Sequence, residues 1–89
     1  MNSHVNARFR KAFALLPLRI QQQARQAYRI FVQNPYDPRL HFRQVHPSRP
    51  IFSVRINEDY RAVGVRDGQD IVWFWIGGHE EYDKLLDRL

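Results

Sequence analysis

The sequence predicts an α+β fold in which two antiparallel amino-terminal helices pack on an antiparallel sheet of three to four strands, followed by a short carboxy-terminal helix. Apolar residues recur at helical spacing as far as Val32 and then follow strand-like patterns from residue 52 to residue 76. Two acids open the final stretch, Glu80–Leu89, where a helix dipole favours them. The 89 residues suffice for one core, so we expect a single domain over residues 1–89.

Two apolar stripes predict the amino-terminal helices. The first runs from Phe9 to Leu16, and the second runs from Ile20 to Val32. Pro17 separates them, because its fixed φ suits the first turn of a helix but not the interior. Asn34-Pro35 ends the second helix. Since the link between the two helices is so short, they are expected to form an antiparallel hairpin.

Strand patterns begin after Pro38. They cover four stretches of the chain: residues 41–45, 52–56, 60–66 and 71–76. The turn at Asp67-Gly68 predicts a hairpin between the last two stretches. Ser3–Asn6 gives a weak signal for an additional strand ahead of the helices.

The stretch from residue 71 to 76 is the most apolar part of the chain. Because every position is apolar, it is predicted to be a central strand that is covered on both faces. Trp73 and Trp75 would share one face of it, and we assign them to the core rather than to the stacking of nucleic-acid bases. Gly77 and Gly78 are expected to end the strand.

The composition and the motifs exclude several classes of protein. The chain has no cysteine, which rules out disulfides and thiolate zinc sites and fits a reducing cytoplasm. The first six residues lack the apolar run of a secretion signal, and residues 71–76 are far too few to span a bilayer. No glycine-rich phosphate loop, Gly-x-Ser-x-Gly elbow or paired-histidine metal motif is present. We therefore expect a cytoplasmic protein without a metal, a small-molecule cofactor or a membrane partner.

The positive charge is concentrated in the amino-terminal part of the chain. Residues 1–36 carry six bases and no acid, whereas residues 37–89 carry eight bases and nine acids. Twelve of the 14 bases are arginine, whose planar guanidinium suits phosphate and carboxylate groups. Such a surface favours nucleic acid or an acidic partner protein. The alternative is an ordinary solvated helix face.

Arg55 and Arg61 flank one predicted turn and are candidate anion-binding residues. If the turn holds an odd number of residues, the two guanidiniums lie opposite each other on one face, where they would repel unless an anion lies between them. If it holds two residues, Arg61 shares its face with Val63 instead, and the sequence leaves this register open. The alternative for either arginine is a surface ion pair with Glu58 or Asp59.

His79 and Tyr82 are candidates for acid–base chemistry. His79 follows two glycines at the end of the last strand, and imidazole transfers protons near neutral pH. Tyr82 lies three residues later, so both side chains can face one cleft. Alternatively, His79 only satisfies a backbone group at the start of the helix and Tyr82 fills the core. His41 and His46 have no carboxylate partner nearby and are expected to be structural or solvent-facing.

Nearly the whole chain resembles the RelE/ParE superfamily of bacterial type II toxin–antitoxin toxins. The resemblance is carried by five short segments in a specific order: Leu16-Pro17, Asn34-Pro35, Ser53-Val54-Arg55-Ile56, Tyr60-Arg61, and Ile76-Gly77-Gly78-His79 with Tyr82. The family fold is an antiparallel sheet packed against two amino-terminal helices, with a shorter last helix. The resemblance therefore implies the same fold as the residue patterns do.

The resemblance also implies an activity and partners. Ribosome-dependent members of the family cleave mRNA without metal, through attack of a 2′-hydroxyl on the adjacent phosphate, and a cognate antitoxin holds them in check. Arg61 matches the arginine of the family's Tyr-Arg strand and would bind the scissile phosphate with help from Arg55. His79 stands where members have arginine or histidine and would act as acid or base. Tyr82 matches a carboxy-terminal tyrosine that stacks on a base or assists proton transfer.

The resemblance implies three alternative functions. The first is that of an endoribonuclease, or mRNA interferase, that inhibits translation and has the ribosome and mRNA as partners. The second is a ParE-like inhibitor of DNA gyrase, a branch whose members generally lack the histidine and tyrosine, so His79 and Tyr82 favour the nuclease. The third is a non-toxic binding module with the same fold. Two features depart from RelE, which has a lysine-rich active-site strand: the acidic last helix, and the few bases interleaved with Glu58 and Asp59.

Overall fold

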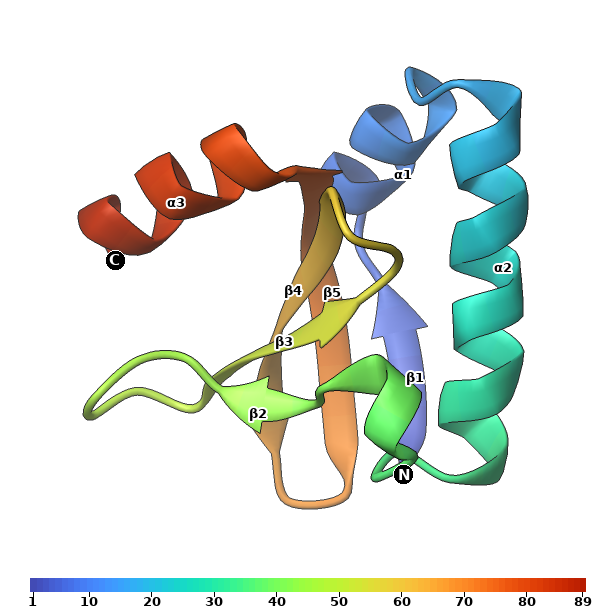
Figure 1. The fold of residues 1–89 in the computed structure, drawn as a ribbon. Helices are drawn as coiled ribbons and strands as arrows, with labels where there is room; N and C mark the ends of the chain where they lie inside the picture. Colours follow the sequence, from blue (N-terminus) through green and yellow to red (C-terminus); the bar gives the residue numbers. More distant parts are fainter.

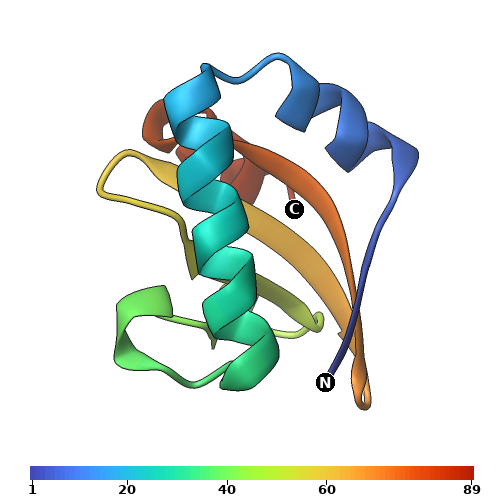
Figure 2. The same ribbon diagram turned by 90° about the vertical axis from the view of Figure 1, so that its right-hand side faces the viewer.

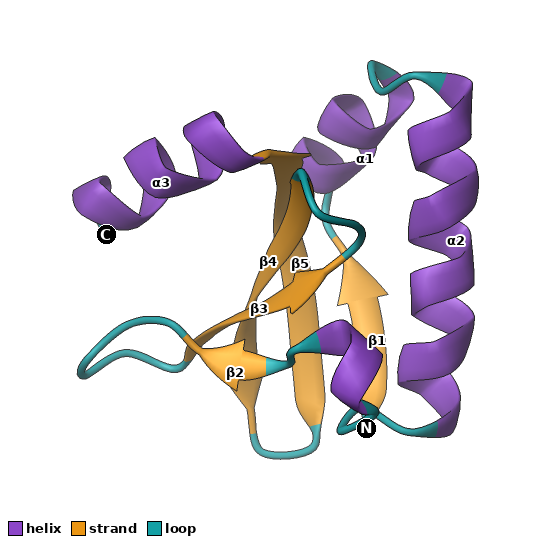
Figure 3. Ribbon diagram, in the orientation of Figure 1, coloured by secondary structure: helices purple, strands orange, loops and turns teal.

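The computed structural model describes all 89 residues and has the predicted α+β architecture (Figure 1). Its helical elements are α1 (Ala7–Ala14), α2 (Leu18–Gln33), the short 3₁₀ helix η1 (Pro38–Leu40) and α3 (His79–Arg88). Its strands are β1 (Asn2–Val5), β2 (Arg43–Gln44), β3 (Ile51–Arg55), β4 (Tyr60–Asp67) and β5 (Asp70–Gly78), in the sheet order β1-β5-β4-β3-β2 (Figure 3). None of the helices combines the length and the apolar character that crossing a bilayer requires.

The sheet has five strands and is mixed, rather than antiparallel with three to four strands. The weak signal near Ser3 marks a real strand, β1, which pairs in parallel with β5 at the edge of the sheet. The indole Nε1 of Trp73 donates a hydrogen bond to Ser3 Oγ at 2.8 Å and ties the two strands together. At the opposite edge, β2 is shorter than the predicted strand over residues 41–45, because η1 and the left-handed His41 (φ 48°) occupy the preceding residues.

The two amino-terminal helices form where the apolar stripes predict them, but they do not lie antiparallel side by side. Helix α1 is inclined to α2 and lies over one end of the sheet (Figures 1 and 2). Phe9 and Phe13 of α1 pack against the core cluster that the sheet and α2 share. Gln21 of α2 donates hydrogen bonds to the carbonyls of Phe13 and Leu16, both at 3.2 Å, and so joins the helices at their connection.

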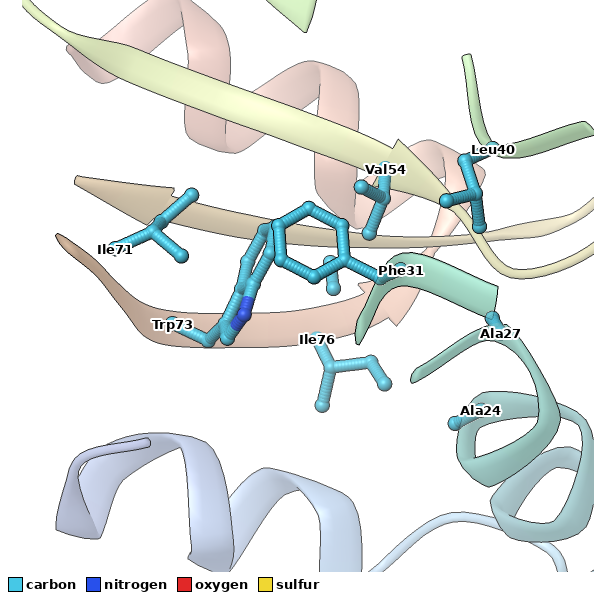
Figure 4. Packing of buried hydrophobic residues seen from close by; sticks show 9 residues of the cluster. Ala24, Ala27, Phe31, Leu40, Val54, Ile71, Trp73 and Ile76 are labelled. Carbon is cyan, nitrogen blue, oxygen red and sulfur yellow. The ribbon is translucent and has the colours of Figure 1, made fainter. Parts of the chain in front are cut away.

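The core is divided between the two faces of the sheet. On the first face, under α1 and α2, nine buried residues form one cluster (Figure 4): Ala24, Ala27, Phe31, Leu40, Val54, Ala62, Ile71, Trp73 and Ile76. The rings of Phe31 and Trp73 meet edge to face there, with 5.4 Å between their centroids. On the second face, Tyr82 of α3 forms a smaller cluster with Ile51 and Val63 of the sheet. The prediction that β5 is an internal strand is confirmed, but its second face is only partly covered, since Val72 is 40% exposed.

A β-bulge in β5 corrects the expectation that Trp73 and Trp75 share a face. Val63 pairs with Trp75 and Gly64 pairs with Trp73, so Phe74 is an extra residue that the partner strand does not match. Trp73 therefore belongs to the cluster on the first face, whereas Trp75 packs against the cluster on the second.

Strand β5 includes the two glycines that are predicted to break it, and it ends at the second of them. The strand continues to Gly78, and Gly77 pairs with Arg61 of β4. The indole ring of Trp75 lies over Gly77, where a Cβ atom would come within 2.7 Å of Trp75 Cζ2. Gly77 thus makes room for an aromatic ring instead of breaking the strand.

Candidate functional site

A hollow of about 330 Å³ opens on the second face of the sheet, between the start of β2, the strands β3 and β4, and helix α3. Seven residues line it: His41, Phe42, Arg43, Ser53, Arg55, Arg61 and Tyr82. Three of them carry a guanidinium and none carries a carboxylate. Three of the four residues that the sequence singled out, Arg55, Arg61 and Tyr82, are therefore brought together.

The register of the β3–β4 hairpin places Arg55 and Arg61 opposite each other. The two residues are direct partners across the strands, with five residues between them, so their side chains leave the same face. This settles the register that the sequence left open. Neither arginine forms an ion pair with Glu58 or Asp59, so the alternative of a surface ion pair is not found.

The guanidinium of Arg61 is held in place by the turn that precedes it. Its Nη1 donates to the backbone carbonyls of Asn57 at 2.6 Å, Tyr60 at 3.0 Å and Glu58 at 3.3 Å. The side chain of Asn57 organises the same turn, because its Oδ1 accepts hydrogen bonds from the backbone N–H groups of Asp59 and Tyr60. Nε and Nη2 of Arg61 make no hydrogen bond within the protein and remain available to an anion.

Tyr82 is a core residue whose hydroxyl reaches the hollow. It is 6% exposed, its ring packs in the cluster with Ile51 and Val63, and its hydroxyl donates to Ser53 Oγ at 3.1 Å. Ser53 is itself 3% exposed, so the pair forms a buried polar contact. Tyr82 is therefore both a core residue and a residue that lines the hollow.

Replacing Tyr82 with phenylalanine is expected to lower the free energy of unfolding by about 1 kcal/mol, because Ser53 Oγ loses its partner in a buried site. Urea unfolding followed by circular dichroism measures this. Tyr28→Phe is the matched control, since Tyr28 is 47% exposed and its hydroxyl has no hydrogen-bond partner in the protein. Equal losses in the two variants would contradict a stabilising role for the Tyr82–Ser53 contact.

His79 lies beside the hollow rather than in it. Its side chain is 58% exposed, and its Nε2 is 3.4 Å from Oδ2 of Asp83, one helical turn later. Its ring stacks on that of Tyr82 with 6.4 Å between centroids, so helical spacing does bring the two together. The expectation that both side chains line one cleft is nevertheless not met, because Tyr82 lines the hollow and His79 does not.

Sequence reasoning missed His41, Arg43 and Ser53. Ser53 and Arg43 are partners across β2 and β3, which places Arg43 next to the two paired arginines. His41 was expected to be structural or solvent-facing; it is exposed and it also lines the hollow. Its position depends on η1, an element that was not predicted.

The short helix η1 had a signal in the sequence. Asp37 is its N-cap and accepts a hydrogen bond from the backbone N–H of Arg39 at 3.0 Å, and Pro38 follows at the first helical position. The guanidinium of Arg39 also binds the carboxylate, with Nη2 to Oδ2 at 2.8 Å. These hydrogen bonds from Arg39 lower the pKa of Asp37 to about 2. An Asp-Pro pair ahead of an isolated apolar residue could therefore have indicated the turn that positions His41.

His46 has a structural role, as expected. Its Nδ1 accepts hydrogen bonds from the backbone N–H groups of Ser48 and Arg49, so its Nε2 carries the proton and donates to the carbonyl of Leu89 at 2.9 Å. This contact joins the loop between β2 and β3 to the end of α3. His46 thus helps to keep α3 over the second face of the sheet.

The charges around the hollow favour an anionic ligand. Arg43, Arg55 and Arg61 have no acidic partner, and guanidiniums gathered in this way are stabilised by a phosphate or carboxylate between them. No group of three or more histidine, cysteine, aspartate or glutamate side chains lies close enough together to hold a metal ion. The site can therefore bind and stabilise negative charge with its arginines.

A second hollow, of about 520 Å³, lies on the other face of the sheet under α1 and α2. Its wall is largely apolar and includes Phe9, Phe13 and Trp73, while the exposed residues Arg10 and Arg25 stand among those that line it. It is well separated from the arginine-lined hollow, because the sheet lies between them. Its apolar wall is complementary to an apolar side chain, and Arg10 and Arg25 are complementary to acidic groups beside that side chain.

Several solved structures share this fold at low sequence identity. YafQ from E. coli strain BL21(DE3) has a TM-score of 0.72 and 10% identity, covering 91% of this chain and 96% of that chain. A chain of the RelB–RelE antitoxin–toxin complex from Methanococcus jannaschii has a TM-score of 0.74 and 11% identity, covering 92% and 96%. The YoeB/ParE toxin from Agrobacterium tumefaciens has a TM-score of 0.69 and 14% identity, covering 89% and 99%.

Sequence comparison gives the family. No curated protein has a significantly similar sequence. The sequence model of the ParE-like toxin domain, however, matches residues 18–84, from the start of α2 into α3. The match covers most of the chain and includes every strand but β1, in agreement with the shared fold. The chain therefore belongs to the ParE-like toxin domain family, within the RelE/ParE superfamily that its sequence motifs resemble.

Proposed function

We propose that this chain is the toxin of a type II toxin–antitoxin pair and that it cleaves mRNA on the ribosome without a metal ion. It would act in the cytoplasm, where its substrate is found. The observation that supports this most is the pairing of Arg55 and Arg61 in a hollow that contains a third arginine and no acid. Such a site is complementary to the phosphate of an RNA backbone.

The proposed chemistry requires stabilisation of charge on a phosphate. As the 2′-oxygen of the substrate bonds to phosphorus and the bond from phosphorus to the 5′-oxygen breaks, negative charge builds on the phosphoryl oxygens. Arg61, already oriented by the turn carbonyls, would bind these oxygens through Nε and Nη2, and Arg55 would bind them from the opposite strand. Tyr82 lines the hollow, and its ring edge and hydroxyl would contact a nucleotide of the substrate. The role of His79 as acid or base stays a prediction.

An antitoxin is the proposed protein partner. The structures that share the fold include toxin–antitoxin complexes, among them RelB–RelE from Methanococcus jannaschii and RelBE2 from Mycobacterium tuberculosis. Residues 1–36 of this chain carry six bases and no acid, and Arg10 and Arg25 line the apolar hollow under the helices. An acidic, amphipathic antitoxin segment would complement this face, while acidic side chains would cover the arginine-lined hollow.

Inhibition of DNA gyrase is the second candidate function. It is favoured by the description of the matching family, which is ParE-like, and by the acidic first turn of α3, an unusual surface to present to RNA. In that case the arginine-lined hollow would bind an acidic protein surface instead of a phosphate. A non-toxic binding module with the same fold is the third candidate.

Expression of the chain in bacteria without an antitoxin, with separate labelling of nascent protein and nascent DNA, distinguishes the three functions. A block in protein synthesis is expected. Arg55→Ala should relieve this block by lowering the cleavage rate about tenfold, the effect of losing roughly 1.4 kcal/mol of transition-state stabilisation. The matched control is Arg66→Ala in β4, since Arg66 lies outside the hollow and binds Gly68 O and Tyr36 Oη.

Two other outcomes would contradict the nuclease. A block in DNA replication with translation intact would select the gyrase inhibitor. Normal growth at good expression would select the binding module. If either synthesis is blocked, an Arg55→Ala effect no larger than that of Arg66→Ala would show that the hollow is not the site of action.

A further inference from the structure

The four histidines of the chain differ in what their rings contact. His4 and His79 each pair with an aspartate, at 3.3 Å and 3.4 Å, and lie outside the arginine-lined hollow. His46 uses both ring nitrogens in hydrogen bonds to the backbone. The ring of His41 has no partner in the protein and is the only imidazole that lines the hollow. His41 thus has a ring without a hydrogen-bond partner, and this ring lies in the arginine-lined hollow.

The backbone aims His41 at the hollow. Its neighbours Leu40 and Phe42 pack toward the first face of the sheet, where Leu40 is 1% exposed and the ring of Phe42 lies 5.2 Å from that of Phe31. His41, between them, is the only residue other than glycine with a positive φ, at 48°, and it ends η1 with a hydrogen bond from its N–H to the carbonyl of Pro38. Such backbone conformations persist where the surroundings enforce them, and they cluster at functional sites.

We propose that His41, rather than His79, is the general base of the reaction, an inference that rests on the proposed function. The charged and titratable groups that share the hollow with it are Arg43, Arg55, Arg61 and Tyr82. The guanidiniums hold their protons throughout the physiological pH range, and the Tyr82 hydroxyl already donates to Ser53. The imidazole of His41, which has no hydrogen-bond partner in the protein, is therefore the one side chain lining the hollow with a free nitrogen that can act as a base.

The proposed cleavage of the RNA backbone needs no reactants other than the RNA and water. The neutral imidazole of His41 takes the proton from the 2′-hydroxyl while the 2′-oxygen forms a bond to the adjacent phosphorus. The bond from phosphorus to the 5′-oxygen breaks, and that oxygen takes a proton from water. The products are a 2′,3′-cyclic phosphate and a free 5′-hydroxyl, and the imidazolium returns its proton to the solvent. No oxidant, reductant or second substrate is needed.

Single-turnover cleavage of mRNA on programmed ribosomes, from pH 5 to pH 9, tests the inference with the full chain. His41→Asn is the informative variant, because asparagine tolerates a positive φ and cannot titrate. Its rate is expected to fall by about 10²- to 10⁴-fold, with the loss of the pH dependence between about pH 5 and 8. His4→Gln is the matched control, because His4 pairs with Asp70 and lies outside the hollow, and it should keep the wild-type pH profile. Urea unfolding of both variants verifies that they are folded.

A second readout does not depend on cleavage. In protein labelled with ¹³C at the histidine rings, inorganic phosphate should shift the NMR signal of the His41 ring and leave that of His79 in place. A shift confined to His79, a wild-type rate in His41→Asn, or loss of the pH dependence in His79→Gln would each overturn the assignment of His41 while leaving the nuclease intact. A wild-type chain that cleaves no mRNA and blocks DNA replication would overturn the proposed function, and the role of His41 with it.

Discussion

Replacement of Arg61 by alanine is expected to lower the rate of ribosome-dependent mRNA cleavage by about 100- to 1000-fold, the usual effect of removing one preorganised donor from a developing oxyanion. The large effect follows from the contacts of Nη1 with the carbonyls of the β3–β4 turn, because a guanidinium that is already oriented needs little reorganisation when charge develops. Arg55 has no such anchor, which is why its loss is expected to cost less. Single-turnover rates for the two alanine variants measure the difference.

The same contacts make Arg61 part of the fold, so the experiment needs a structural control. Asn57→Ala removes the side chain that accepts hydrogen bonds from Asp59 and Tyr60 and binds Gln23 at 2.6 Å, but it leaves the guanidinium in place. This variant should lose stability and, because the turn also orients Arg61, part of its cleavage rate, but clearly less of the rate than Arg61→Ala loses. If Asn57→Ala and Arg61→Ala lose the same fraction of the rate, the role of Arg61 is to shape the turn and not to bind phosphate.

The parts of the fold that the sequence predicts correctly are those set by local pattern. Two patterns each mark the buried side of one element: the apolar stripe from Ile20 to Val32 and the alternation from Phe52 to Ile56. The helix and the strand that they predict both form. The parallel pairing of β1 could not be predicted in this way, because Ser3 acquires its partner Trp73 only when residues 70 positions apart meet. The inclination of α1 to α2 is likewise not set by a local pattern, because Phe9 and Phe13 pack against a core that distant segments share.

The candidate site shows the same division. The sequence predicts the hairpin that carries Arg55 and Arg61 but leaves its register open, and the nearness of His79 to Tyr82 follows from helical spacing. Helical spacing does not determine which way the ring of His79 points, however, and it lies beside Asp83, outside the hollow. His41 reaches the hollow through η1 and a left-handed backbone, neither of which shows as a periodic pattern. The placement of His41 at the hollow therefore could not be predicted from sequence periodicity.

Replacing Trp73 by alanine is expected to lower the free energy of unfolding by about 3–5 kcal/mol, the usual cost of removing a buried tryptophan. The side chain is 4% exposed, its ring meets that of Phe31 edge to face, and its Nε1 binds Ser3 across to β1. For a domain of this size the loss is a large part of a total of roughly 5–15 kcal/mol. Urea unfolding followed by circular dichroism measures it, and Trp73→Phe should recover part of the loss by restoring the aromatic contacts.

Trp75→Ala is the matched control for Trp73→Ala, because it removes the same side chain from the same strand on the other face of the sheet. Trp75 is only half-buried, so its loss should cost clearly less than that of Trp73. The two variants also separate the fluorescence of the tryptophans: the ring left in Trp75→Ala is buried and should emit at shorter wavelength than the one left in Trp73→Ala. Equal energetic losses together with equal emission would mean that both rings lie in one environment, as strict alternation along β5 predicts, and the bulge at Phe74 would then be wrong.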